Sequence, residues 1–264
     1  MKHFLKLFLF LTALFISKTS IAQDSPDTVK YMIDETVISA TRTEQKLIDI
    51  PFSAQRVDQS QWKSTRKMGM NDVLSVIPGL WLQPRYGNHD VRVSIRGFGT
   101  RSNTGIRGVR ILLDGIPESE PDGQTRLEAL DFTAISKIEV IKGNMTSLYT
   151  NAPGGVINFF TDKYFPQPFV LMDNEFGSYD LRKNGLKFGL TSSDERFMAT
   201  YSYENYNGYR DHNQEYQSRF NSIYEADLNP VSTVSIYGYY VNGLLKLPGS
   251  LTLEQFNENY LQAN

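Results

Sequence analysis

The 264-residue chain contains no cysteine, so it has no disulfides, thiolate metal sites or thiol nucleophiles, and we expect no cysteine-linked lipid anchor. Its net charge of -2 lacks the basic excess that neutralises phosphates, so we expect no nucleic-acid partner. Three histidines are present, and His89 and His212 lie far apart in the sequence. A zinc site or a histidine-based triad is therefore poorly supplied, and we predict no metal site and no cofactor.

Signatures of catalysis are also missing. No phosphate-binding loop and no nucleophile elbow occurs in the sequence. The glycines at 97 and 99 follow a predicted strand, as in a dinucleotide fingerprint, but Ser102 takes the sixth position and no helical pattern follows. Asp114 and Asp122 each precede a glycine, which is turn chemistry. We predict that the protein is not an enzyme.

The N-terminus has the order of an export signal. Positive charges at Lys2 and Lys6 precede an apolar run at 7–16, and Ser20 and Ala22 place small residues before a cleavage point. The run of about ten residues is short of the ~20 needed to span a bilayer as a helix. We predict a signal peptide over residues 1–22 that is cleaved after Ala22; the alternative is an uncleaved anchor. No later run is long enough for a helical span, so insertion into a membrane would use strands.

Residues 23–46 form a polar leader that contains one short β-prone segment, residues 34–40 (DETVISA). A lone strand-forming segment between polar stretches has no obvious local partner. It suits a segment that pairs with the sheet edge of another protein. The alternative is an ordinary first strand of the domain that follows.

Residues 47–163 have the pattern of a small α/β domain. Alternating or continuous apolar runs predict strands, and two segments predict short helices, one capped by Asn71 and ended by Pro78 and Gly79. The expected strands lie at 51–57, 91–95, 109–113, 137–141 and 156–160, and the expected helices at 71–77 and 127–135. We expect a small mixed β-sheet with short helices.

Residues 169–264 alternate apolar and polar side chains with a period of two. This is typical of strands with one face in lipid and the other in a polar lumen, although a soluble β-sandwich also alternates. The chain has 15 Tyr and 16 Phe, and membrane barrels carry such residues in belts. The length suffices for about five strands of ~10 residues. The mostly apolar residues at every second position of these expected strands are Leu186, Phe188, Leu190, Phe197, Ala199, Tyr201, Tyr203, Phe220, Ser222, Tyr224, Ala226, Leu228, Val234, Ile236, Gly238 and Tyr240.

Six motifs follow one another at the spacing of a known family. They are residues 71–79 (NDVLSVIPG), 93–99 (VSIRGFG), 111–117 (ILLDGIP), 138–143 (IEVIKG), 147–149 (SLY) and 152–158 (APGGVIN). In this series the chain resembles the plug domain of TonB-dependent outer-membrane receptors. Residues 96–124 are similar to receptors for iron complexes of the ferric citrate and siderophore type. The resemblance covers residues 34–264 and implies an α+β plug domain followed by antiparallel β-strands of an incomplete transmembrane β-barrel.

The resemblance also implies roles for particular residues. A short strand, the TonB box, would be grasped by the C-terminal domain of TonB, which works with ExbB and ExbD. Arg96 and Glu139 would be buried charges paired within the plug or with the barrel wall; the alternative is that they are solvated strand ends. Loop residues would face the ligand. The box residues are Glu35, Thr36, Val37, Ile38, Ser39 and Ala40, and the ligand-facing residues are Tyr86, Asn88, His89, Arg101 and Asn103.

The function implied is energy-coupled uptake of an iron complex across the cell outer membrane, with TonB, the ligand and outer-membrane lipid as partners. A barrel that encloses such a plug needs about 22 strands, so we expect this chain alone not to be transport-competent. One alternative is a stand-alone periplasmic plug-like binding module. Another is a receptor for cobalamin, copper or a glycan. A hydrolase would need a catalytic residue that the sequence does not offer.

Overall fold

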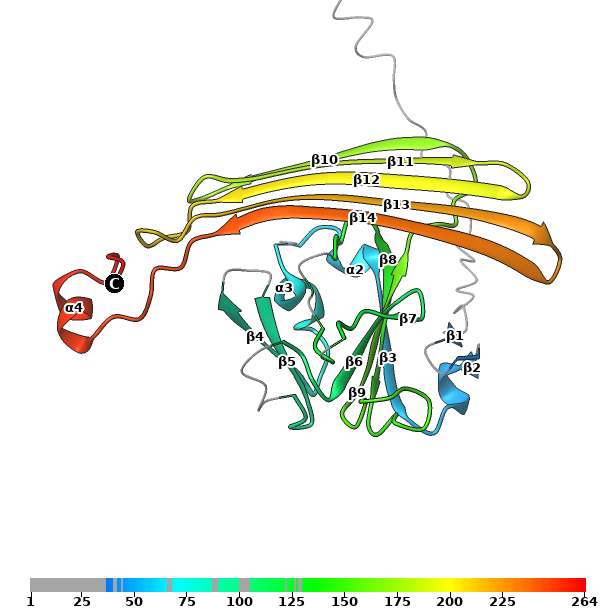
Figure 1. Cartoon of the computed structure of the whole chain (residues 1–264), viewed down its shortest axis with the longest axis horizontal. Coiled ribbons are helices and arrows are strands. Elements are labelled where there is room, and N and C mark those ends of the chain that lie inside the picture. Colours follow the sequence, from blue (N-terminus) through cyan, green and yellow to red (C-terminus); the bar gives the residue numbers. More distant parts are fainter. Residues whose placement is uncertain are drawn as a thin grey trace, which may run out of the picture. The chain divides into compact units, whose positions relative to one another are not determined.

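A computed structural model describes residues 37–39, 42–43, 45–65, 68–86, 90–99, 105–121, 123–125, 127 and 130–264 (Figure 1). For residues 37, 85, 86 and 90 it describes the backbone alone. The predicted signal peptide and most of the predicted leader lie outside these residues. Residues 35–264 belong to one compact unit.

The first part of the chain is built on a five-stranded sheet in the order β3-β8-β9-β6-β7, here called the mixed sheet. Only β6 and β9 run parallel; the other neighbours are antiparallel. The strands are β3 (Ser53–Asp58), β6 (Val109–Leu113), β7 (Ile116–Pro117), β8 (Ile135–Lys142) and β9 (Gly155–Thr161). The small mixed sheet predicted from the sequence is thereby confirmed.

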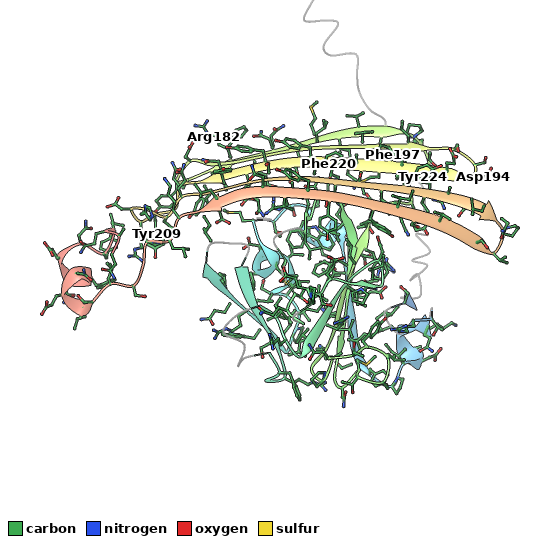
Figure 2. All side chains as sticks on the ribbon, in the orientation of Figure 1. Arg182, Asp194, Phe197, Tyr209, Phe220 and Tyr224 are labelled. Atoms are coloured by element: carbon green, nitrogen blue, oxygen red, sulfur yellow. The ribbon has the colours of Figure 1, made fainter. Side chains whose placement is uncertain are left out.

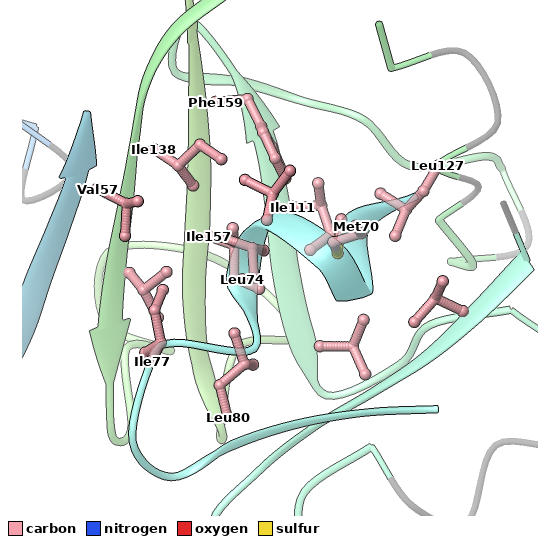
Figure 3. Close-up of a cluster of buried hydrophobic side chains, with 14 of the residues drawn as sticks. Val57, Met70, Leu74, Ile77, Leu80, Ile111, Leu127, Ile138, Ile157 and Phe159 are labelled. Carbon is pink, nitrogen blue, oxygen red and sulfur yellow. The ribbon is translucent and has the colours of Figure 1, made fainter. Parts of the chain in front are cut away.

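The mixed sheet is buried on both faces, which explains why its strands read as nearly continuous apolar runs. On the first face, Ile138, Ile157 and Phe159 pack against the short helices α2 (Gln59–Trp62) and α3 (Met70–Leu74) (Figure 3). The opposite face buries a second cluster under the N-terminal segment. That cluster comprises Ile38, Ile50, Leu112, Ile141, Met145, Tyr149, Ala152 and Val156.

Of the two helix predictions, the one at 71–77 is wrong in its details and the one at 127–135 is wrong altogether. Asn71 is not an N-cap: α3 begins at Met70, and the N–H of Gly69 donates to the carboxylate of Asp72. No described residue of 127–135 is helical. Asp131 accepts the N–H of Thr133 and so forms a turn, after which Ile135 already starts β8. A short polar side chain here offers the backbone a local alternative to the helix.

The sequence patterns did not reveal β4 (Leu80–Tyr86). This strand pairs antiparallel with β5 (Asp90–Ile95) as a separate hairpin. The remaining short elements of this part are β1 (Val37–Ile38), β2 (Gln45–Lys46) and the 3₁₀ turn η1 (Leu47–Asp49).

The second part of the chain is one antiparallel sheet of five strands in sequence order (Figure 1). We call it the antiparallel sheet. Its strands are β10 (Phe169–Gly177), β11 (Leu181–Thr191), β12 (Glu195–Tyr206), β13 (Glu215–Asn229) and β14 (Ser232–Leu245), and the helix α4 (Leu253–Glu258) follows them. The links after β11 and β13 are short, whereas the chain between β12 and β13 and the chain after β14 are longer. Membrane barrels have short turns at the periplasmic rim and longer loops outside.

The antiparallel sheet has the reverse of the usual distribution of polarity. One row of paired positions on its first face is formed by Met172, Leu186, Tyr201, Phe220 and Tyr240. These side chains are between 38% and 76% exposed, and Phe197, Phe220 and Tyr224 of this apolar face can be followed in Figure 2. On the opposite, polar face, Lys187, Arg219 and Glu225 are at most 3% exposed. A sheet that exposes aromatics and buries charges is built for an apolar surrounding.

The antiparallel barrel strands predicted from the period of two are therefore confirmed. Among the described residues, no helix has the length and apolar character required to cross a membrane.

Candidate functional site

The segment predicted as the TonB box is attached to the molecule by a minimal pairing. Val37 and Ile38 form β1 and pair antiparallel with Lys46 and Gln45 of β2. The turn between them is closed by the N–H of Arg42, which donates to the carbonyl of Ser39 at 3.0 Å. β1 and β2 make a two-stranded sheet of their own and do not extend the mixed sheet.

Of the two box side chains that the structure describes, those of Ile38 and Ser39, the apolar one enters the core. Ile38 is fully buried in the cluster beneath the second face of the mixed sheet. Full burial of an isoleucine side chain contributes about 1.5–3 kcal/mol relative to exposure. The side chain of Ile38 and a short ladder therefore dock the described part of the box.

Glu139 adds a polar contact to this docking. The backbone N–H of Ser39 donates to Glu139 Oε2 at 2.9 Å, across 100 residues of sequence. Glu139 is fully buried in the middle of β8, and Lys137 Nζ lies 2.8 Å from its Oε1. A buried carboxylate requires such partners, because an uncompensated charge in the interior is costly. Glu139 is thus buried and paired with Lys137 within the mixed sheet.

The turn of the N-terminal segment has a second contact with the domain. The guanidinium of Arg42 lies 4.7 Å from the ring centroid of Tyr149, a cation–π geometry. Burial raises the pKa of the Tyr149 phenol, and Arg42 offsets only part of that rise. The ring is therefore neutral around neutral pH and presents its face to the cation.

Arg96 does not fit the expectation of a buried charge. It follows the last residue of β5, adopts a positive φ of 50°, and its side chain is exposed. With Gly97 at φ 87° it forms the corner of a tight turn that follows β5. Arg96 thus lies one residue beyond the end of the strand, and because the chain holds only the first strands of the wall, pairing of Arg96 with the barrel wall stays a prediction.

The predicted ligand-facing loops cannot be placed. Asn88, His89, Arg101 and Asn103 lie outside the described residues, as do Glu35, Thr36 and Ala40 of the box, and Tyr86 is described by its backbone only, as the last residue of β4. Their roles stay predictions. Within the part of the chain that the structure describes, no three His, Cys, Asp or Glu side chains gather so as to hold a metal ion.

The sequence patterns also missed a group of charged residues between the two sheets. Asp162 and Lys163, directly after β9, form ion pairs with Lys187 and Glu225 on the polar face of the antiparallel sheet. The available signal was weak: charged residues stood at lumen-facing positions of predicted strands, which by itself is ordinary for a barrel.

Replacing Glu139 by alanine is expected to loosen the box. The Ser39 N–H would lose a charged acceptor, and such hydrogen bonds contribute about 1.5–3 kcal/mol, so amide exchange of residues 37–46 should become at least about tenfold faster. Glu139→Gln keeps an acceptor oxygen and should give an intermediate rate. Hydrogen-exchange mass spectrometry of the full-length protein in detergent measures both. Unchanged exchange in Glu139→Ala would show that the Ser39–Glu139 bond does not hold the segment.

The geometry defines a class of protein. A small mixed-sheet domain with a loosely docked N-terminal strand precedes antiparallel strands that bury charge and expose apolar side chains. Residues 46–156 match the family model described as TonB-dependent Receptor Plug Domain.

Known proteins agree with that class. The chain is 31% identical over 130 residues to the Vitamin B12 transporter BtuB of Vibrio vulnificus, a match that covers 48% of this chain and 20% of that protein. It is 29% identical over 133 residues to a hemin receptor of Yersinia enterocolitica, covering 50% of this chain and 18% of that one. The ferripyoverdine receptor of the outer membrane of Pseudomonas aeruginosa superposes with a TM-score of 0.62 at 21% identity, over 79% of this chain and 27% of that one.

The chain thus carries a TonB-dependent receptor plug domain over residues 46–156, followed by antiparallel strands, and it shares its fold with part of a solved outer-membrane receptor. It spans about one fifth of the length of the curated relatives that it matches.

Proposed function

We propose that the chain is the N-terminal portion of a receptor that takes up an iron complex across the outer membrane, driven through TonB. After export and cleavage following Ala22, residues 23–46 carry the TonB box, residues 47–163 form the plug, and residues 169–264 begin the barrel. The chain alone does not transport.

The observation that carries the coupling role is the way in which the box is held. β1 lies outside the mixed sheet, and over the described residues its ladder with β2 consists of two residue pairs. A partner that offers a sheet edge can form more main-chain hydrogen bonds with the box than β2 does, which is how strand addition gives affinity. The box can therefore leave the plug without breaking the ladder of the mixed sheet.

The location in the outer membrane is supported by the antiparallel sheet. A water-soluble module would have to expose the row from Met172 to Tyr240 to solvent, and contiguous apolar faces of this kind are rare on soluble proteins. In lipid the same face is favourable, and the charged polar face turns toward the plug. This favours a receptor over a stand-alone periplasmic module.

An iron complex is the substrate that the family resemblance favours, because residues 96–124 are similar to ferric citrate and siderophore receptors. The relatives are named for vitamin B12, hemin and ferrioxamine. Uptake of radio-iron as ferric citrate and as ferric siderophores, compared with hemin and cobalamin in cells that express the full-length receptor, decides between them. Cobalamin uptake alone would replace the iron complex in this proposal.

The coupling role predicts that Val37→Pro weakens capture of the receptor by the TonB C-terminal domain. Proline removes the backbone N–H and fixes φ, so it cannot take part in the ladder that an added strand requires. We expect binding to weaken by at least about tenfold, the result of losing one or two main-chain hydrogen bonds. Surface plasmon resonance with purified TonB C-terminal domain and detergent-solubilised full-length receptor measures the affinity.

The matched control is Val37→Ile, which changes the side chain and keeps the N–H, and which should bind as the unaltered receptor does. Failure of the unaltered receptor to bind TonB in the presence of its ligand contradicts the proposed function. Equal loss in both variants would mean that the Val37 side chain, rather than the main chain, is recognised.

A further inference from the structure

The short link from the plug to the first barrel strand is held by ion pairs. Lys187 Nζ lies 2.5 Å from Asp162 Oδ2, and Lys163 Nζ lies 2.6 Å from Glu225 Oε2. Lys187 is 3% exposed and Glu225 is 2% exposed, so both pairs reach into the interior. Two consecutive residues of opposite charge are thus matched by two opposite charges on the polar face of the antiparallel sheet.

Glu225 is the centre of this network. Besides Lys163, its carboxylate accepts a bond from Arg196 at 2.9 Å and one from the Ser235 hydroxyl at 3.0 Å. Arg196 also bonds Asp227 at 2.8 Å. Glu225 therefore ties the link to β12, β13 and β14 together, and a buried ion with several bonds of this kind fixes one arrangement of its partners.

Aromatic packing closes the link against the sheet. The rings of Phe165 and Phe169 meet edge to face with centroids 4.9 Å apart. They lie over Gly189, where a Cβ would come within 2.5 Å of Phe169 and 2.6 Å of Phe165. Both cations of the network lie near the ring of Tyr164 in a cation–π geometry. Lys163 lies 5.4 Å and Arg196 5.2 Å from the ring centroid.

The charge state of Lys163 is consistent with a permanent ion pair. Burial by itself lowers the pKa of the ammonium, but the hydrogen bond to Glu225 and the nearby negative charges outweigh burial, so the pKa of Lys163 lies above its ordinary value. The Lys163 ammonium is therefore charged around neutral pH, as the ion pair requires.

The other end of the plug is attached very differently. The N-terminal segment is docked through β1, β2 and the Ser39–Glu139 bond, and the next strand, β3, lies at the edge of the mixed sheet and pairs with β8 alone. An edge strand can be removed while the other four strands stay paired. β9, which leads into the link, lies in the centre of the sheet between β8 and β6.

We propose that residues 162–165, together with Lys187, Arg196 and Glu225, are an anchor that keeps the plug on the barrel wall while a pull on the N-terminus detaches β3. The anchor gives the pull a fixed end, so force separates strands within the plug and does not draw the plug out as a body. The pulling role rests on the coupling by TonB proposed above.

Two introduced thiols report on the two ends, because the chain has no cysteine of its own. The first thiol is Val57→Cys; Val57 lies in β3 and is 1% exposed in the resting structure. Ala134→Cys lies on the plug, is 3% exposed, and packs against Met198 and Ile223 of the antiparallel sheet. The rate of maleimide labelling of each is measured in cells that express the full-length receptor, with and without TonB and in the presence of ligand.

With the anchor intact, we expect TonB to accelerate the labelling of Val57→Cys and to leave Ala134→Cys protected. Glu225→Gln removes the central charge and should make Ala134→Cys label about tenfold faster in the presence of TonB, as expected for local separation of the plug from the wall. Lys163→Met should act in the same direction and leaves the Arg196–Glu225 pair intact, so it separates the anchor from a general defect of the sheet.

The matched control is Arg182→Gln. It removes the ion pair of Arg182 with Asp180, which also joins an arginine and a carboxylate at 2.7 Å, but whose side chains are 62% and 38% exposed and away from the link. This control should leave both labelling rates unchanged. Each variant is verified as folded by its heat-modifiable mobility in electrophoresis, which should equal that of the unaltered receptor.

The outcomes separate the two proposals. Suppose that TonB accelerates the labelling of Val57→Cys. If Ala134→Cys then labels equally fast with Glu225 intact, or if Glu225→Gln leaves the labelling rate of Ala134→Cys unchanged, the anchor is wrong and the coupling role stands. If TonB changes neither rate, the coupling proposal and the pulling role both fail. Hydrogen exchange of residues 162–169 in the resting receptor then decides whether the attachment exists: about tenfold faster exchange in Glu225→Gln supports it, and unchanged exchange overturns it.

Discussion

A receptor with arginine in place of Phe220 is expected to fail to assemble in the outer membrane. Phe220 lies on the apolar face of β13, in the row with Leu186, Tyr201 and Tyr240, and is 43% exposed. A lipid-facing arginine near the bilayer midplane costs about 2–4 kcal/mol in a membrane barrel. The neighbouring Arg219 carries no such cost, because it faces the opposite side of the sheet and is 2% exposed.

The matched control is Tyr216→Arg. Tyr216 is on the same strand and the same face, in a row that already contains Arg182 and Asn205 at the end of the sheet. At that depth an arginine costs about 0–1 kcal/mol. The measurement is the folded fraction of full-length receptor after insertion into lipid vesicles, read from its heat-modifiable mobility. Equal folding of the two variants would show that this face does not contact lipid.

The period of two predicts β11 to β14 because one face of each strand must be apolar in lipid. The pairing Leu186–Tyr201–Phe220 confirms the side assigned to each residue. The alternation is weaker in β10, where Val170, Leu171 and Met172 are consecutive and all exposed. This strand is at the edge of the described sheet, so its two faces are less strongly constrained.

Local patterns fail where tertiary contacts decide. Pro84 weakens the strand signal in β4, yet the hairpin forms, with a shift of register between Pro84 and Tyr86. Residues 127–135 have apolar residues at helical spacing, but Leu127, Phe132 and Ile135 reach the core from turns and from a strand start. Spacing alone cannot distinguish these solutions, because each buries the same side chains.

The candidate site shows the same limit. The short β-prone segment at 34–40 could be predicted from its residues, but not its pairing with Gln45 and Lys46, and the burial of Glu139 was expected from its motif. That Glu139 accepts the N–H of Ser39 could not be predicted, because the contact joins residues 100 positions apart. The anchor was missed for the same reason: the ion pair of Lys163 and Glu225 spans 62 positions and depends on the placement of the plug on the sheet.

Replacing Gly155 by alanine should destabilise the plug strongly, and more than the replacement of Gly97 by alanine. Gly155 has φ +142°, which L side chains rarely adopt, and an added Cβ would lie 2.2 Å from the carbonyl oxygen of Ile141. The residue cannot move away, because it pairs with Lys142 on one side and Val109 on the other. Backbone strain of about 1–3 kcal/mol and overpacking of about 1–3 kcal/mol add to a loss of about 4 kcal/mol.

Gly97→Ala separates the steric effect from the conformational one. Gly97 also has a positive φ, +87°, but no atom lies within 4 Å of an added Cβ. This substitution should therefore cost only about 1 kcal/mol, the price of placing alanine in a conformation that suits glycine. Native-state hydrogen exchange of peptides from β8 and β9 in the full-length receptor gives both values. If the two substitutions destabilise the plug equally, the close approach of Gly155 to Ile141 is not what requires glycine there, and backbone conformation alone accounts for both positions.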